Sequence, residues 1–471
     1  MSGSTIREYI SNATAQTIGR AFSMAASFAV FVLAARFLGP VQFGRYAYLM
    51  VFWGVLVTVA EFGTNSVLAK QLAQNRGHGA AYLGNFIMFR TALYMITILL
   101  ALPAASYLRP DLFTYLVAGI AALPVLGSRF FEPLFQIYGR PWFSLWLSSG
   151  YSAAYLIFSL FVFFWKPALG NVIAAYIAAN VFYLLLALFL VGKVVRPTFK
   201  PESAIFSSIL RLAWPIGLSG ILTLVQMRAD TFMLAFMKGD VEVGLYNAAY
   251  KFLDMAVILA VMITNPLMPI FSRQAEEDRE KLRENFVNIL EIISFCIVPV
   301  AVITPFVSGP LLSLCYGHEF TKAAFALDIM AWIGVMTFCS MLNYTVLVAL
   351  EVVKFQVWLT ALSAAMNVGL NLLLIPDYGF TGSALATLLT ELLLAGVSFL
   401  YVIKTVGNVF SYRKWSLALT ANLLLLIFLV SDSFNDIIIS VIFGSATYLF
   451  FLVYSGILPS ALKISRKTLT G

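Results

Sequence analysis

Charged residues are scarce in this sequence. They make up 11% of its 471 residues, whereas a soluble globular protein typically has about 25%. Hydrophobic residues make up 61% of the chain, which excludes a water-soluble globular domain. The composition therefore predicts an all-α polytopic membrane protein.

Cysteine and histidine are also scarce. Cys296, Cys315 and Cys339 are isolated in the sequence, and His78 and His318 lie in predicted loops with no second ligand near them. Neither a disulfide framework nor metal-ligand spacing is present. We therefore expect no metal and no other cofactor.

Fourteen apolar stretches have about the 17 to 25 residues that a helix needs to cross a bilayer. The stretches are 14–36, 44–69, 81–106, 112–138, 143–165, 171–192, 210–236, 244–270, 289–314, 323–350, 355–375, 380–403, 415–430 and 437–458. An even number of spans places both termini on the same side of the membrane.

Lysine and arginine indicate which side that is. With the N-terminus inside, 19 of the 30 Lys and Arg residues lie on inner segments, six on outer segments and five within spans. Inner loops of membrane proteins carry this excess of positive charge, so both termini are expected in the cytoplasm. The net charge of +8 then reflects topology and contact with anionic lipid, and no nucleic-acid partner is expected.

Long outer loops are missing as well, because every predicted outer connection is short. Membrane-embedded glycan polymerases and ligases usually carry a large outer loop. The chain is therefore expected to be a carrier and not an enzyme.

A repeat divides the chain. The segment 39–46 (GPVQFGRY) returns 200 positions later as 239–246 (GDVEVGLY), each between apolar stretches. Six spans precede the basic, proline-containing segment near the middle, so the halves are expected to be parallel repeats, as in many transporters. The predicted parts are a six-helix bundle (1–192), a cytoplasmic linker (193–209), a second six-helix bundle (210–403), and an extra helix pair with a basic tail (404–471).

Polar residues form stripes along the first helix of each half. In span one they recur at steps of three or four residues, which places them on one helical face. Spans seven and eight contain polar residues at the same spacing. The residues are Asn12, Gln16, Arg20, Ser23 and Ser27 in span one, Ser219, Thr223, Gln226 and Asp230 in span seven, and Asn247, Lys251 and Asp254 in span eight. A polar cavity between the halves explains such stripes; interhelical hydrogen bonding is the alternative.

Five cations lie within predicted spans, and each is a candidate for function. They are Arg20, Arg90, Arg129, Arg228 and Lys251. Arg129 has Glu132, and Lys251 has Asp254, three residues further along the same helix, which favours local neutralisation. For Arg20, Glu61 lies at a similar depth and is a possible partner on span two.

Acidic residues within spans are candidates for energy coupling. Glu391 lies near the middle of span twelve without a nearby cation in sequence, which makes it the first candidate for a proton carrier. An uncharged carboxyl in a hydrogen bond is the alternative. Glu61 and Asp254 are further coupling candidates.

A family pattern begins at the end of span one and continues to the inner loop after span two. Its residues are Ala35–Pro40 (ARFLGP), Phe43–Tyr46 (FGRY), Glu61–Gly63 (EFG), and the inner Lys70 and Arg76. This pattern resembles the start of polysaccharide-biosynthesis flippases, the Wzx-like branch of the multidrug/oligosaccharidyl-lipid/polysaccharide exporter superfamily. Fourteen spans depart from the twelve of many relatives and are similar to lipid II flippases, where the extra pair forms a lipid groove.

The resemblance implies a V-shaped pair of bundles in the bacterial inner membrane. Such a protein translocates a polyprenyl-pyrophosphate-linked oligosaccharide by alternating access for O-antigen, capsule or exopolysaccharide biosynthesis. The resemblance also implies that cavity cations bind the lipid phosphates, Arg20 and Arg90 first, and that a polysaccharide polymerase and chain-length machinery are partners.

Two other classes stay open. A multidrug cation antiporter of the same superfamily would share the frame, but the acid-free, Arg20-bearing first span fits an anionic substrate better. A glycan polymerase or ligase would need paired carboxylates on a large outer loop. Neighbouring glycosyltransferase genes would favour the flippase, and a drug-responsive regulator the antiporter.

Overall fold

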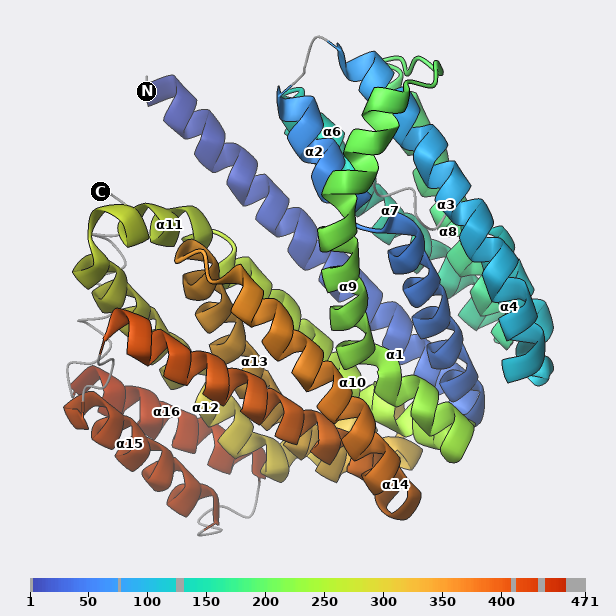
Figure 1. Cartoon of the computed structure of the whole chain (residues 1–471). Coiled ribbons are helices and arrows are strands. Elements are labelled where there is room, and N and C mark those ends of the chain that lie inside the picture. The colour runs from blue at the N-terminus through green and yellow to red at the C-terminus, as the bar shows by residue number, and fades with distance from the viewer. Residues whose placement is uncertain (1–2, 75–77, 124–130, 408–411, 431–436, 455–471) are drawn as a thin grey trace. The chain divides into compact units, whose positions relative to one another are not determined.

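The computed structural model describes residues 3–74, 78–123, 131–407, 412–430 and 437–454, and these residues are helical apart from short connections (Figure 1). The chain divides into two compact units, Met1–Ala235 and Phe236–Gly471, which we call unit 1 and unit 2.

In unit 1, α1 packs along α7, and α7 packs along α8. The helices are α1 (Gly3–Glu61), α2 (Thr64–Gln74), α3 (Gly79–Leu108), the 3-10 helix η2 (Pro110–Leu112), α4 (Phe113–Ala121), α6 (Glu132–Ile137), α7 (Pro141–Trp165), α8 (Leu169–Val191) and α9 (Ser203–Met237), which belongs to unit 1 as far as Ala235.

In unit 2, α13 packs along α10, α12 and α14. The helices are α10 (Asp240–Thr264), α11 (Leu267–Glu277), α12 (Arg279–Tyr316), the 3-10 helix η4 (His318–Ala323), α13 (Ala324–Ala349), α14 (Val353–Val406), α15 (Tyr412–Val430) and α16 (Ile437–Tyr454).

Two helices are too long for one membrane crossing, and each contains a break at a glycine. Gly39 in α1 has φ 71° and ψ 169°, and Gly379 in α14 has φ 55° and ψ −136°. Glycine adopts positive φ without the steric cost that a Cβ imposes. Helix α14 therefore supplies two of the predicted spans, 355–375 and 380–403. Helix α1 supplies 14–36 and most of 44–69, whose end lies in α2 (Thr64–Gln74).

Nine helices within the described residues are long and apolar enough to cross a membrane, and eleven result when α1 and α14 are divided at their breaks. Of the remaining predicted spans, 415–430 lies within α15, and 437–458 begins with α16 and runs past its end. The predicted span 112–138 is not one helix among the described residues: α4 covers only Phe113–Ala121, α6 begins at Glu132, and 124–130 lie outside the described residues. The all-helical polytopic class is confirmed, whereas the number fourteen stays a prediction.

The 200-residue repeat is visible in backbone geometry. Gly239 has φ 89° and ψ −173°, close to the values at Gly39. The aligned tyrosines Tyr46 and Tyr246 are both buried, 3% and 0% exposed, and Phe43 and Val243 are fully buried. Both copies therefore form the same glycine break followed by a buried helical turn.

The segment after span six is held against α3. Asn85 of α3 donates to the carbonyl of Lys200 (3.0 Å) and accepts from the amide of Glu202 (2.9 Å). The amide of Thr198 donates to the carbonyl of Ala80 (2.9 Å). Helix α9 then begins at Ser203, so the end of the predicted linker 193–209 is helical.

The C-terminal helix pair belongs to unit 2. Leu425 and Leu429 of α15 share an apolar cluster with Phe295 of α12 and Tyr448 of α16. The Tyr448 hydroxyl donates to the Phe295 carbonyl (3.0 Å). The pair is therefore packed on α12 and is not a detached tail.

Helix α9 lies very close to the break between α1 and α2. Phe62 (φ 42°) and Gly63 (φ 73°) form that break. A Cβ on Gly217 of α9 would lie 2.8 Å from the Phe62 ring and 2.9 Å from its carbonyl oxygen. Only a residue without a side chain fits at position 217.

Gly217→Ala is accordingly expected to destabilise the protein by about 1 to 3 kcal/mol, the usual cost of overpacking. Gly220→Ala is the matched control, because a Cβ on Gly220 of the same helix would meet nothing within 4 Å; there alanine favours the helix by about 0.5 to 1 kcal/mol. Thermal unfolding in detergent measures both. Equal midpoints for the two variants would contradict the close packing of α9.

Candidate functional site

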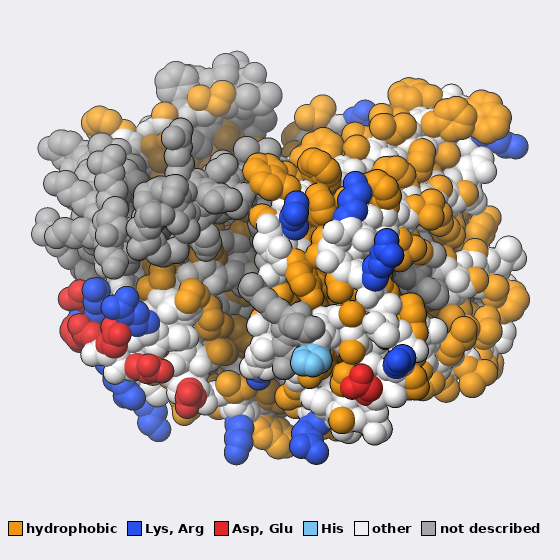
Figure 2. All heavy atoms as spheres, turned by 90° about the horizontal axis from the view of Figure 1, so that it is seen from above, with side chains coloured by type: hydrophobic (Ala, Val, Ile, Leu, Met, Phe, Trp, Pro, Cys, Tyr) orange, Lys and Arg blue, Asp and Glu red, His pale blue; other side chains and the backbone are white. Residues whose placement is uncertain are grey.

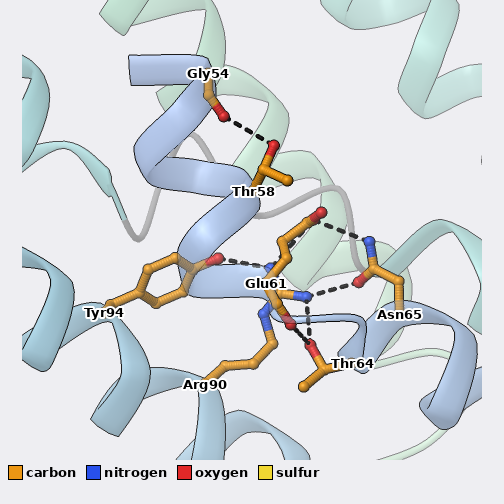
Figure 3. Close-up of polar contacts among 7 residues, drawn as sticks. All are labelled: Gly54, Thr58, Glu61, Thr64, Asn65, Arg90 and Tyr94. Atoms are coloured by element: carbon orange, nitrogen blue, oxygen red, sulfur yellow. Dashed lines mark hydrogen bonds and ion pairs between the residues drawn. The ribbon is translucent and has the colours of Figure 1, made fainter. Parts of the chain in front are cut away.

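A polar cluster joins three helices inside unit 1 (Figure 3). It is centred on Arg90 of α3, whose residue surface is 1% exposed. Its Nη1 donates to Asn65 Oδ1 (2.6 Å) and Thr64 Oγ1 (3.3 Å), and its Nη2 donates to the Tyr94 hydroxyl (2.7 Å) and Glu61 Oε1 (3.3 Å). We call Glu61, Thr64, Asn65, Arg90 and Tyr94 the Arg90 cluster.

The break between α1 and α2 places the acceptors of this cluster. Helix α1 ends at Glu61, and two residues of positive φ turn the chain into α2. Thr64 Oγ1 donates to the Glu61 carbonyl (2.6 Å), and Asn65 Nδ2 donates to Glu61 Oε1 (2.9 Å). The turn therefore gathers three acceptors around one guanidinium.

Charge in the cluster is balanced by one ion pair. Arg90 Nη2 lies 3.3 Å from Glu61 Oε1, and the side chains are 2% and 25% exposed respectively. The carboxylate thus reaches the surface while the guanidinium does not. A phosphate can contact Arg90 only after Glu61 or Asn65 has moved away from it.

Among the described residues, the cation that pairs with Glu61 is Arg90 of span three. Arg20 lies on α1, but its side chain and those of Asn12 and Gln16 are outside the described residues, as is Arg129. The pairing of Arg20 with Glu61 therefore stays a prediction.

The remaining described part of the first stripe faces α7. Ser23 accepts a hydrogen bond from Ser152 (2.9 Å) and donates to the Ser148 carbonyl (3.4 Å), whereas Ser27 is exposed. Ser23 therefore serves interhelical hydrogen bonding, the alternative to a cavity.

The stripes of spans seven and eight combine buried and half-buried side chains with one exposed residue, Thr223. Gln226, Asp230 and Asn247 are buried, 8%, 1% and 5% exposed. Asp230 accepts from the Thr231 amide (2.6 Å), and Asn247 donates to the Val243 carbonyl (2.9 Å). Lys251 and Asp254 of the stripe in span eight are half-buried, as is Arg228, which lies on α9 outside the stripe.

Glu391 is half-buried on α14, and its Oε2 lies 3.4 Å from Ser340 Oγ of α13. The alternative to a proton carrier at this position is a carboxyl held in a hydrogen bond. The contact supports that arrangement and leaves a coupling role untested.

Two cations of unit 1 that the sequence places in predicted outer loops are also paired. Arg109 donates two hydrogen bonds to Asp111 (2.9 and 2.8 Å), and Arg45 lies 3.8 Å from the same carboxylate. Hydrogen bonding from Arg109 lowers the pKa of Asp111 below its ordinary value, despite some opposing desolvation. Arg45 and Arg109 are therefore poor candidates for binding an anion directly.

Surface charge is dispersed in the view of Figure 2. Lys and Arg side chains occur at separate points among hydrophobic ones, and most visible acidic side chains gather in one area. The coloured part of this face shows no continuous basic groove. Among the described residues, no group of three or more His, Cys, Asp or Glu could hold a metal ion.

Sequence reasoning missed Thr64, Asn65 and Tyr94 as partners of Arg90. Tyr94 lies four residues after Arg90 on α3, a spacing that places both on one helical face. Thr64 and Asn65 directly follow the Glu61–Gly63 motif. The spacing of Tyr94 and the position of Thr64 and Asn65 can be read from the sequence. Neither indicates that α3 contacts the break between α1 and α2.

Two family models match the chain. One described as "Polysaccharide biosynthesis protein" matches residues 9–275, and one described as "Lipid II flippase MurJ" matches residues 143–454. Each match covers more than half of the chain.

Relatives come from archaea and bacteria. An uncharacterized membrane protein of Methanocaldococcus jannaschii is 22% identical over 90% of both chains. A probable low-salt glycan biosynthesis flippase of Haloferax volcanii is 22% identical over 79% of each chain. The lipopolysaccharide biosynthesis protein WzxC of Escherichia coli is 27% identical over 54% of this chain and 52% of its own.

Solved structures with the same fold are transporters. The lipid II flippase MurJ in an inward closed conformation has a TM-score of 0.77 at 17% identity, covering 95% of this chain and 99% of its own. An inward-facing multidrug resistance MATE family transporter has a TM-score of 0.69 at 16% identity, covering 82% and 94%. At these identities the likeness concerns the fold alone.

Proposed function

This chain belongs to the polysaccharide-biosynthesis family of flippases, and from that premise we propose that it translocates a polyprenyl-pyrophosphate-linked oligosaccharide across a bacterial inner membrane by alternating access. Membership makes it a multi-pass membrane transporter of lipid-linked glycan and not an enzyme. The pyrophosphate carrier, the V-shaped arrangement of two bundles and the glycan's destination in O-antigen, capsule or exopolysaccharide are parts of the proposal.

The observation that carries the proposal is the set of arginines placed within an otherwise apolar transporter. Arg90 lies inside unit 1, and Arg20 lies on α1 upstream of the Gly39 break. A guanidinium offers two parallel donors that match the oxygens of phosphate. Arginine therefore suits a doubly phosphorylated lipid better than an organic cation.

Arg90 and Arg20 take different parts in this proposal. Arg90 holds the α1–α2 break through its hydrogen bonds to Glu61 and Asn65, so it positions the cavity wall. Arg20 contacts the phosphate first, with Arg129, Arg228 and Lys251 as further cations along the path. A ligand that displaces Glu61 would bring Arg90 into contact as well.

Topology and partners complete the proposal. Both termini lie in the cytoplasm, as the excess of inner Lys and Arg indicates. A polysaccharide polymerase and chain-length machinery receive the glycan outside. Half-buried Glu391, with Glu61 and Asp254, couples transport to an ion gradient.

Translocation of a defined lipid in proteoliposomes tests this function. The wild-type chain is expected to move a short-chain polyprenyl-pyrophosphate disaccharide to the opposite leaflet faster than protein-free vesicles do. The same lipid with a neutral linker in place of pyrophosphate is the matched control and is expected to move at the protein-free rate. Equal transport of both lipids would show that the pyrophosphate is not recognised. Transport of cationic dyes in place of the lipid would favour the multidrug antiporter.

A further inference from the structure

A line of polar groups crosses the packing interface of α13 and α14 in unit 2. Ser340 and Asn343 lie one turn apart on α13, and Glu391, Ala395 and Ser398 follow one face of α14. Asn343 Nδ2 donates to the Ser398 hydroxyl (2.9 Å) and to the Ala395 carbonyl (3.2 Å). We call these five residues the α13–α14 seam.

Ser340 has one hydrogen for two neighbours. Its Oγ lies 3.1 Å from the Thr337 carbonyl oxygen and 3.4 Å from Glu391 Oε2. A hydroxyl donates once, and a main-chain carbonyl only accepts. If Ser340 donates to the nearer Thr337, its contact with Glu391 needs a hydrogen on the carboxyl.

Asn343 also needs a donor. The residue is 0% exposed, its amide nitrogen donates to α14, and its Oδ1 is buried without a hydrogen-bond partner. A buried acceptor without a donor is unfavourable in an apolar setting. Ser398 cannot supply the hydrogen while it donates to the Ala395 carbonyl (3.1 Å).

We propose that the α13–α14 seam is a proton-binding site, in which Glu391 carries the proton and donates a hydrogen bond to Ser340, the seam residue that it contacts. The added hydrogen lets Ser340 keep its hydrogen bond to the Thr337 carbonyl while it contacts Glu391. After loss of that proton, the contact with Ser340 requires the Ser340 hydroxyl to donate to Glu391 in place of the Thr337 carbonyl, so we expect the ionised form to favour a different packing of α13 on α14. The two forms thereby give two states with different proton affinity, as coupling requires.

Other acids in unit 2 have to be separated from Glu391 in any titration. Helices α10 and α12 pack against α13 and α14 and carry Lys251, Asp254 and Glu291 within their apolar parts, while α13 itself carries Asp328. Asp254→Asn, Glu291→Gln and Asp328→Asn are therefore controls for Glu391→Gln.

Infrared difference spectroscopy of the full chain in lipid nanodiscs, with no substrate, tests the site directly. A carboxylic-acid C=O band that disappears at alkaline pH is expected in the wild type and is expected to be absent in Glu391→Gln. Asn343→Leu is expected to shift the band and weaken proton binding about tenfold, one pH unit in the midpoint. Thr390→Val is the matched control, because that hydroxyl donates to the Ala386 carbonyl of its own helix; its spectrum should equal the wild type's.

Three results would overturn the site. The band could persist in Glu391→Gln, it could vanish only in one of the other acid variants, or it could be insensitive to both Asn343→Leu and Ser340→Ala. A wild-type spectrum that responds to Na⁺ at constant pH and not to pH would identify Na⁺ as the ligand and reject the proton.

The coupling role rests on the proposed function and has its own readout. In proteoliposomes with an imposed pH gradient, Glu391→Gln is expected to bind the lipid-linked glycan yet lose the gradient-driven part of transport. A gradient-insensitive wild type would reject the coupling while the infrared result still decides the proton site. Absence of any glycan transport would instead reject the flippase.

Discussion

Arg90→Ala is expected to lower the free energy of unfolding by about 3 to 5 kcal/mol, the cost of leaving a buried ion pair with one partner. The change removes the donor shared by Asn65, Tyr94 and Glu61. Since folded proteins are stable by only about 5 to 15 kcal/mol, folded protein in the membrane should fall severalfold. Detergent-resistant monomer and the thermal midpoint measure this loss.

A double variant distinguishes a positioning role of Arg90 from a role in phosphate binding. Arg90→Met with Glu61→Leu removes both charges and is expected to recover much of the stability, because no uncompensated charge remains. Thr91→Ala is the neighbouring control, since Thr91 donates only to the Ile87 carbonyl of its own helix in the contacts described (2.8 Å). If the double variant folds and still transports, Arg90 is a positioning residue; if Arg90→Ala keeps wild-type stability, the cluster does not hold the break.

Arg20→Ala is expected to abolish export while the protein level stays near that of the wild type. Arg20 belongs to the polar stripe that the sequence predicts for span one, and that predicted span contains no acid, so removal of the side chain should affect phosphate binding more than folding. Arg20→Lys keeps the charge but not the two parallel donors, and is expected to retain about a tenth of the export rate, the effect of losing one strong charge-assisted hydrogen bond.

Arg211→Ala is the control for the loss of a basic residue, because Arg211 is an exposed residue of α9. Export by this variant should match the wild type. Full export by Arg20→Ala would end the phosphate role. A greatly reduced amount of Arg20→Ala protein, with normal export per molecule, would make Arg20 structural.

Much of the fold could be predicted from sequence because membrane spans are set by length and apolarity. The Gly39 and Gly239 breaks could also be placed, since a repeated glycine at the same point of two apolar segments indicates repeated geometry. What could not be placed was α9. Its sequence reads as the first helix of the second half, but Ile205, Ile209 and Ala213 lie in the core of unit 1 with Phe86 and Tyr183.

The candidate site was predicted in part. Arg90 and Glu61 were both singled out, because a charge inside a span is costly and therefore informative. Their mutual pairing was not predicted, since depth along the membrane gives no angular position around the bundle. The Ser340 and Asn343 partners of Glu391 were missed for a related reason: small polar residues on one helix look alike until the facing helix is known.

The anchoring of residues 198–202 on Asn85 bears on how the protein is made. The core of unit 1 includes Ile205 and Ile209 of α9, so the first six spans leave the ribosome before the residues that complete their packing have been synthesised. Until then Asn85 on α3 lacks the carbonyl of Lys200 and the amide of Glu202. The repeat that the sequence predicts and the compact unit of the structure are consequently different stretches of chain, and synthesis has to pass the predicted repeat boundary before the packing of the first unit can be completed.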